Sequence, residues 1–254
     1  MSGLHQGRPV GPSSPGRRLI AALALGVAAS LIGGSGAAAQ TGWYLSGSGG
    51  ALLRQDSVSV DVRFQKTILL PGPPPTSATI HTLASQRLSY DPGAVGNLAL
   101  GYRLSGHLRA EAEIGYAAYD VSALQAFSPD PRFSGLKNQV FQRSSGAEVQ
   151  RLTGTLNAFY DFNPIGRLVT PYVGFGGGIA DFHRSAGVFT NGAVGSLTQA
   201  KGDWTAFAAF VEAGAAVRLS RRWSLVPAYR FSKISFRDDG ELAHIFKVGA
   251  RYAF

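Results

Sequence analysis

The chain has 254 residues, a net charge of +9, 33 glycines and only 15% charged residues. A soluble domain carries nearer a quarter charged residues, so this composition favours a protein with an apolar environment. The absence of cysteine excludes disulfides, a thiol nucleophile and a thiolate zinc cluster. The Lys and Arg residues are spread along the chain, which argues against a nucleic-acid site and favours attraction to anionic lipid headgroups.

The first 39 residues have the three parts of a secretory signal peptide. Arg17 and Arg18 form a basic stretch, 19–32 is an apolar run, and small residues end at Ala39. The apolar run is shorter than the about 20 residues that a membrane-spanning helix requires. We therefore predict cleavage after Ala39 and one domain over 40–254, with a retained anchor helix as the alternative.

After the predicted cleavage site, apolar residues alternate with period two in segments of about ten residues, the length of a tilted barrel strand. No other stretch is apolar and long enough for a membrane helix, so a membrane-spanning domain must be a closed barrel. In the last segment Lys247 and Arg251 oppose a row of apolar side chains. That row is Phe246, Val248, Ala250, Tyr252 and Phe254.

Eight such segments follow one another along the chain. Their connections are long at 54–92, 120–150 and 182–203 and medium at 235–243. The other connections are short, at 105–107, 163–169 and 220–222. Alternation of short and long connections is typical of outer-membrane barrels, and we predict an all-β, eight-stranded, antiparallel, up-and-down transmembrane barrel. The expected strands are 43–53, 97–104, 108–116, 152–162, 171–181, 207–218, 223–232 and 246–254.

Two further patterns refine this prediction. The first long connection contains the alternating segment 58–64 before a proline-rich stretch at 71–75, so its strands are expected to extend beyond the membrane. Aromatic residues gather near the predicted strand ends, where an interfacial girdle would place them. These are Trp43, Tyr44, Tyr119, Tyr160, Phe162, Tyr172, Trp204, Trp223 and Tyr252.

Three features of 40–254 carry a family resemblance. The domain opens Gly-Trp-Tyr-Leu-Ser-Gly at 42–47, has Pro-Tyr-Val-Gly-Phe-Gly-Gly-Gly at 171–178, and ends in an aromatic-alternating strand with Phe254. The chain thereby resembles the opacity or surface-antigen porin-like proteins of the small Gram-negative outer-membrane β-barrel superfamily. The resemblance implies an outer-membrane location. It also implies that Tyr252 and Phe254 form the signal read by the barrel-assembly machinery.

Charged residues recur on the faces opposite the apolar rows. An eight-stranded barrel has an interior just wide enough for its own side chains, and buried charges require partners. We interpret these residues as a lumen charge network that plugs the barrel. A narrow polar conduit or gate is the alternative. The predicted network comprises Arg103, Arg109, Glu111, Glu113, Glu212, Arg218, Arg230, Lys247 and Arg251.

The sequence offers little support for catalysis or a cofactor. Glu111 and Glu113 are neighbouring carboxylates, but surrounding arginines explain them better as ion-pair partners. A surface hydrolase like the lipid A deacylases would need a histidine and a serine one strand apart, which His244 with Ser232 or Ser235 permits. No two histidines of the domain have metal-ligand spacing, so we predict no catalytic, cofactor or metal residues. The histidines are His81, His107, His183 and His244.

We therefore predict a non-enzymatic outer-membrane protein of a Gram-negative bacterium, with a structural or surface-antigen role. Its expected partners are membrane lipids, lipopolysaccharide and the assembly machinery, and it is expected to be a monomer that binds no nucleic acid. Three alternatives stay open: a narrow porin-like channel, a lipid A-modifying hydrolase, and a soluble lipocalin-like barrel. Apolar inward residues near the outer rim would favour a channel for apolar solutes. In a lipocalin-like barrel, Lys247 and Arg251 would point outward.

Overall fold

The computed structural model describes residues 42–54, 57–70, 76–127, 139–193, 195–236 and 239–254. The predicted signal peptide and the proline-rich stretch lie outside these described residues. Within the described ranges the chain forms thirteen strands joined in one sheet. None of the described residues belongs to a helix long and apolar enough to cross a membrane.

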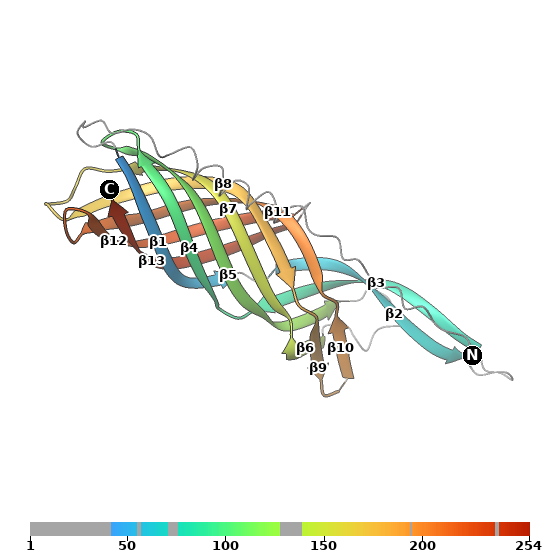
Figure 1. Cartoon of the computed structure of the whole chain (residues 1–254). Coiled ribbons are helices and arrows are strands. Elements are labelled where there is room, and N and C mark those ends of the chain that lie inside the picture. The colour runs from blue at the N-terminus through green and yellow to red at the C-terminus, as the bar shows by residue number, and fades with distance from the viewer. Residues whose placement is uncertain (1–41, 55–56, 71–75, 128–138, 194, 237–238) are drawn as a thin grey trace, which may run out of the picture.

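Eight of these thirteen strands close into an antiparallel barrel (Figure 1). The last strand pairs with the first from Tyr44↔Ala253 to Arg54↔Ala243, so the barrel has no open edge. The predicted eight-stranded barrel is therefore confirmed. In order around the barrel its strands are β1 (Gly42–Arg54), β4 (Gly93–Arg103), β5 (Leu108–Phe127), β7 (Glu148–Asp161), β8 (Val169–Arg184), β11 (Gly202–Arg218), β12 (Trp223–Phe236) and β13 (Asp239–Ala253).

The short connections gather at one end of the barrel, together with the start of β1 and the C-terminus (Figure 1). We call this the short-turn end and the opposite one the long-loop end. Backbone hydrogen bonds close two of the turns, from Leu104 N to Leu108 O at 2.8 Å and from Leu219 N to Trp223 O at 2.9 Å. In outer-membrane barrels short turns face the periplasm and longer loops the exterior.

At the long-loop end the chain continues as strands where loops were predicted. β12 and β13 pair as far as Phe236↔Asp239, so the prediction of a medium loop at 235–243 is wrong for most of its length. The physical reason is that inward apolar residues continue beyond the barrel's middle. Ile234, Ala243 and Ile245 are all buried and hold the two strands together.

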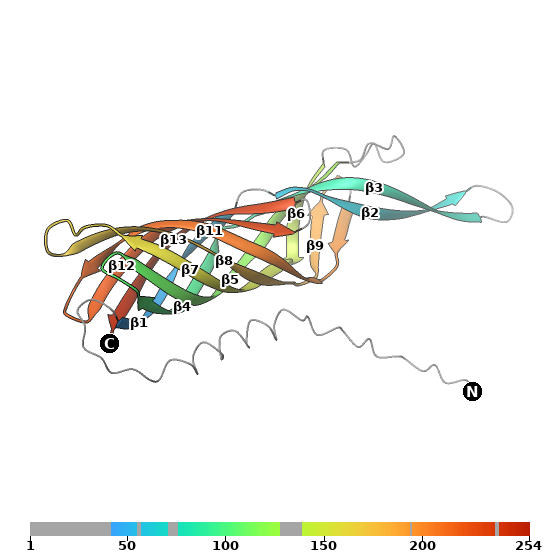
Figure 2. The same ribbon diagram turned by 90° about the horizontal axis from the view of Figure 1, so that it is seen from above.

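The other long connections build a second part of the sheet beyond the barrel. β2 (Ser57–Leu70) and β3 (Thr76–Tyr90) form a hairpin that projects from the long-loop end in both views (Figures 1 and 2). This confirms that strands of the first connection extend past the barrel. The strands β6 (Gln139–Gly146), β9 (Gly187–Asn191) and β10 (Gly195–Gln199) continue the sheet from the far end of β5.

In the short-turn half of the barrel, apolar and charged side chains are distributed in the reverse of the pattern of a soluble protein. Large apolar side chains such as Leu98 and Phe175, each 66% exposed, cover the outside, whereas charged residues are buried inside. Towards the long-loop end the interior becomes apolar, with Leu52 and Val121 fully buried. Lys247 lies 8% exposed in the lumen, which is the reverse of the arrangement expected for a lipocalin-like barrel.

Candidate functional site

The predicted lumen network is where the structure concentrates buried charge. Arg103 and Arg218 excepted, every member of the predicted set is at most 8% exposed. The period-two alternation of the strands turns these residues inward, and the register places β11 Glu212 beside β12 Arg230. The buried members are Arg109, Glu111, Glu113, Glu212, Arg230, Lys247 and Arg251.

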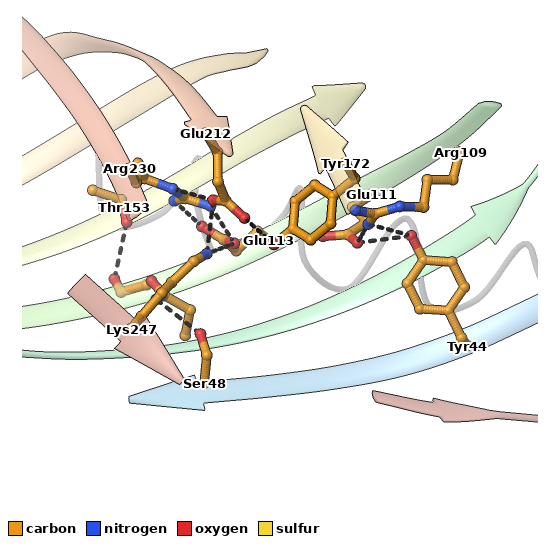
Figure 3. Close-up of polar contacts among 12 residues, drawn as sticks. Tyr44, Ser48, Arg109, Glu111, Glu113, Thr153, Tyr172, Glu212, Arg230 and Lys247 are labelled. Carbon is orange, nitrogen blue, oxygen red and sulfur yellow. Dashed lines mark hydrogen bonds and ion pairs between the residues drawn. The ribbon is translucent and has the colours of Figure 1, made fainter. Parts of the chain in front are cut away.

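Arg230 organises the central group of the network (Figure 3). Its two terminal nitrogens donate to the two carboxylate oxygens of Glu113 at 2.5 and 2.9 Å, and its Nε donates to Glu212 at 2.7 Å. Lys247 Nζ lies 2.9 Å from Glu212 Oε2 and 3.8 Å from Glu113 Oε2. Two acids and two bases from four strands therefore neutralise each other across the lumen. The Arg230 guanidinium also stacks over the Phe210 ring at 3.6 Å.

Arg109 organises a second group nearer the short-turn end. Its guanidinium donates to Asp161 at 2.9 Å and forms an ion pair with Glu111. Tyr44 donates its hydroxyl hydrogen to Glu111 at 2.7 Å. Tyr172 donates in the same way to Glu212 at 2.9 Å, on the side facing the central group. Tyr172 lies between the two groups (Figure 3) and links them, because its hydroxyl binds Glu212 and its ring centre lies 4.6 Å from the Arg109 guanidinium carbon.

Two predicted members stand at the edge of this network. Arg103 has a side chain 40% exposed and reaches Asp161 only at 3.8 Å. Arg218 is exposed at the end of β11, so its assignment to the network is wrong. Arg218 lies on the same face of β11 as Glu212 and was therefore expected to point inward, but the strand ends where the barrel opens to water. The alternation of inward and outward residues does not by itself predict how far along a strand the lumen remains closed.

Three residues assigned to the aromatic girdle, Tyr44, Tyr119 and Tyr172, lie inside the barrel instead. Tyr44 is 3% exposed and Tyr172 is 2% exposed, and both bind carboxylates. Their rings fill space that glycines leave: a Cβ on Gly214 would come within 2.7 Å of the Tyr172 ring, and one on Gly101 would collide with Tyr44. Tyr119, 4% exposed, also lies inside. The alternation of the strand could have predicted these positions, because each tyrosine is on the same face of its strand as the inward residues.

A further ion-pair group, not predicted, lies towards the long-loop end. Arg54 Nη2 approaches Glu241 Oε2 to 2.7 Å, and Arg151 Nη1 lies 3.9 Å from the other oxygen of that carboxylate. Arg54 also stacks over the Tyr90 ring at 3.6 Å. The sequence prediction missed this group because Glu241 fell within the expected loop at 235–243.

Little space remains between these side chains. One lumen cavity, beside Lys247 and Arg251, has a volume of about 30 Å³. A second, between Arg151 and Arg230, also measures about 30 Å³. A water molecule needs at least about 10–15 Å³, so each cavity has room for one or two waters. The described interior is thus packed like a protein core.

The arrangement does not assemble the catalytic groups considered from the sequence. Ser232 is buried and lines the lumen, whereas His244, which follows its cross-strand neighbour Ala243, faces outward against Tyr229. Ser235 pairs with Gly240, four residues along the strand from His244. Among the described residues, no three of the His, Asp and Glu side chains form a group suited to a metal ion.

A closed antiparallel barrel with an apolar exterior and a charged interior defines a transmembrane β-barrel of the outer-membrane type. This chain belongs to the outer membrane protein beta-barrel domain family, whose characteristic sequence pattern matches residues 19–254. Membership of this family implies the outer membrane of a Gram-negative bacterium as the location. No curated protein matches the chain.

Several solved barrels have a similar chain path. Neisserial surface protein A is 14% identical, with a TM-score of 0.44 over 84% of this chain and 97% of its own. The outer membrane protein OprG from Pseudomonas aeruginosa is 13% identical, with a TM-score of 0.43 over 85% and 97%. The outer membrane protease OmpT from Escherichia coli is 8% identical, with a TM-score of 0.42 over 87% and 99%.

Proposed function

We propose that this protein is a non-enzymatic structural and surface-exposed component of the outer membrane, with a lumen closed to solutes. The observation that carries the proposal is the pair of ion-pair groups, linked through Tyr172, that fill the short-turn half of the lumen. Arg230 and Arg109 each bind two carboxylates there, and the cavities beside them have volumes of only about 30 Å³. A solute larger than water has no path past these side chains without breaking buried pairs.

Opening such a path is costly. Removing one partner of a buried ion pair leaves an uncompensated charge, at a cost of about 3–5 kcal/mol. The interior beyond the network is closed as well, because Leu52, Phe182 and Ile245 are 0–3% exposed in the apolar cluster at the long-loop end. The lumen is therefore blocked successively by charge pairs and by apolar packing.

Conductance across a planar lipid bilayer tests the closed lumen. The refolded full chain is expected to give no steady conductance. A difference in gel migration between unboiled and boiled protein verifies that the barrel has folded. The variant Lys233→Ala, at an exposed position of β12 outside the lumen, should likewise give no steady conductance. A steady ohmic conductance from the unaltered protein would overturn the proposal.

The channel for apolar solutes is a second candidate with one observation in its favour. Inward residues near the long-loop end are apolar, among them Leu52, Val95 and Ile245. They are also tightly packed, so passage would require the strands to part sideways. Faster uptake of an apolar solute by liposomes containing the protein, without ionic conductance, would support this candidate over the closed barrel.

The remaining features of the proposal concern assembly and partners. We propose export through the signal peptide cleaved after Ala39, insertion directed by Tyr252 and Phe254, and a monomer surrounded by membrane lipids and lipopolysaccharide. The Phe254 side chain, 72% exposed at the short-turn end, is accessible to an assembly factor. The strands that continue beyond the barrel would supply the surface that outside partners contact.

A further inference from the structure

The cavity between Arg151 and Arg230 differs from the other lumen cavity in its charge. It is lined by these two arginines, by the hydroxyl residues Thr155 and Ser232, and by apolar side chains such as Ile245. Within the described part of the chain, no carboxylate lines it. The cavity beside Lys247 is lined by Glu111, Glu113 and Glu212 instead.

Arg151 carries a charge that the protein compensates only weakly. It is 4% exposed, and its Nε and Nη1 atoms have no hydrogen-bond partner. Its nearest carboxylate, that of Glu241 at 3.9 Å, is bound more closely by Arg54 at 2.7 Å. Two buried guanidinium groups thus share one carboxylate. Buried charge without a close partner is strongly unfavourable, so an additional negative charge would stabilise this region.

The hydroxyls of Thr155 and Ser232 are unpartnered at the same cavity. Each residue is 7% exposed, and neither side-chain oxygen has a hydrogen-bond partner. They come from β7 and β12, which are not neighbours in the barrel, so they line the cavity from different sides. A hydroxyl can donate to an anion as readily as to a carbonyl. The cavity therefore combines unused donors with uncompensated positive charge.

We propose that this cavity binds a small inorganic anion, such as chloride, held by Arg151 with the hydroxyls of Thr155 and Ser232. The volume of about 30 Å³ leaves room for a monatomic anion. Arg230 lines the cavity too, but its charge is already matched by Glu113 and Glu212. The anion would be taken up as the barrel closes, since apolar packing covers the lumen towards the long-loop end.

Direct observation in the unaltered full chain is the first test. Protein refolded and crystallised in sodium bromide is expected to show an anomalous scattering peak between Arg151, Thr155 and Ser232. Absence of a peak there, with water density in its place, would overturn the proposal. This measurement needs no variant and so does not depend on whether an altered lumen folds.

The second test measures the effect of the anion on stability. Ligand that binds only the folded state stabilises it in a saturable manner. The temperature at which unboiled protein loses its folded gel mobility should rise with sodium chloride, against sodium gluconate at equal ionic strength. The double variant T155V/S232A should raise the half-saturating chloride concentration about tenfold, because hydrogen bonds to a charged group are among the stronger ones. Ser46→Ala, at the other cavity, is the matched control.

Two outcomes of the stability test would contradict an anion site. One is equal stability of the unaltered protein in chloride and gluconate, which would mean that water alone fills the cavity. The other is an unchanged chloride dependence in Arg151→Gln, which would place the responding site elsewhere. Loss of the chloride effect in Arg151→Gln, with its retention in Ser46→Ala, supports the proposal.

Discussion

At the scale of single residues, Arg230 holds together the ion pairs at the centre of the lumen. It binds Glu113 and Glu212, which stand on β5 and β11 with two other strands between them around the barrel. We predict that Arg230→Ala lowers the free energy of unfolding by about 3–5 kcal/mol, since it leaves two buried carboxylates with Lys247 as their one remaining cationic partner in the central group. Urea titration in lipid vesicles measures this change.

The exposed Lys233 supplies the control for this prediction. It stands on the same strand and faces outward. Lys233→Ala should change the free energy of unfolding by no more than about 0.5 kcal/mol, as surface substitutions usually do. Equal losses in Arg230→Ala and Lys233→Ala would show that the buried pairs do not contribute specifically to stability.

Residue identity alone did not predict where each aromatic lies. An aromatic near a strand end is typical of the interfacial girdle, and Trp223 and Tyr160 are indeed exposed near the short-turn end. Tyr44 and Tyr172 have the same sequence setting but lie in the lumen. What separates them is the face of the strand on which they lie: Tyr172 faces the lumen, where Gly214 has no side chain to occupy the space of its ring. The side of a strand is a stronger signal than its end.

At the scale of elements, period-two alternation was sufficient to predict eight strands and the positions of the short turns. It indicated an extension past the barrel only for the first long connection and missed the continuation of β12 and β13, because the same alternation serves a core beyond the barrel. Ile234 and Ala243 are buried in this way, although sequence analysis placed Ala243 in a loop. The apolar cluster that they join depends on contacts between distant segments such as β6 and β9, which alternation does not reveal.

The continuous pairing of β12 with β13 predicts slow hydrogen exchange beyond the expected strand ends. Lys233 pairs with Leu242 within an antiparallel ladder, so amides there should be protected far more than those of the exposed turn 105–107. Hydrogen–deuterium exchange of the protein in lipid nanodiscs, followed by mass spectrometry, provides the measurement. Exchange of 233–236 and 239–242 as fast as that of the turn would instead indicate the loop inferred from the sequence.

At the scale of the whole molecule, two kinds of interior share one barrel. The short-turn half has ion pairs inside and apolar side chains outside, whereas the interior of the long-loop half is apolar. Outward apolar side chains such as Leu98, Phe175 and Val211 are 57–66% exposed and are suited to lipid. Membrane lipids therefore pack against the outer face, whereas ion pairs between the protein's own side chains fill the lumen.

This arrangement predicts a depth-dependent response to charge on the outer face. Phe175 lies near the middle of β8 and Leu219 lies at a short turn, with exposures of 66% and 65%. Phe175→Arg should cost about 2–4 kcal/mol of unfolding free energy and Leu219→Arg about 0–1 kcal/mol, because a charge near the interface reaches water. Guanidinium titration in lipid vesicles compares the two. Equal costs would mean that the outer face does not span an apolar layer, since matched exposure leaves depth as the difference between the sites.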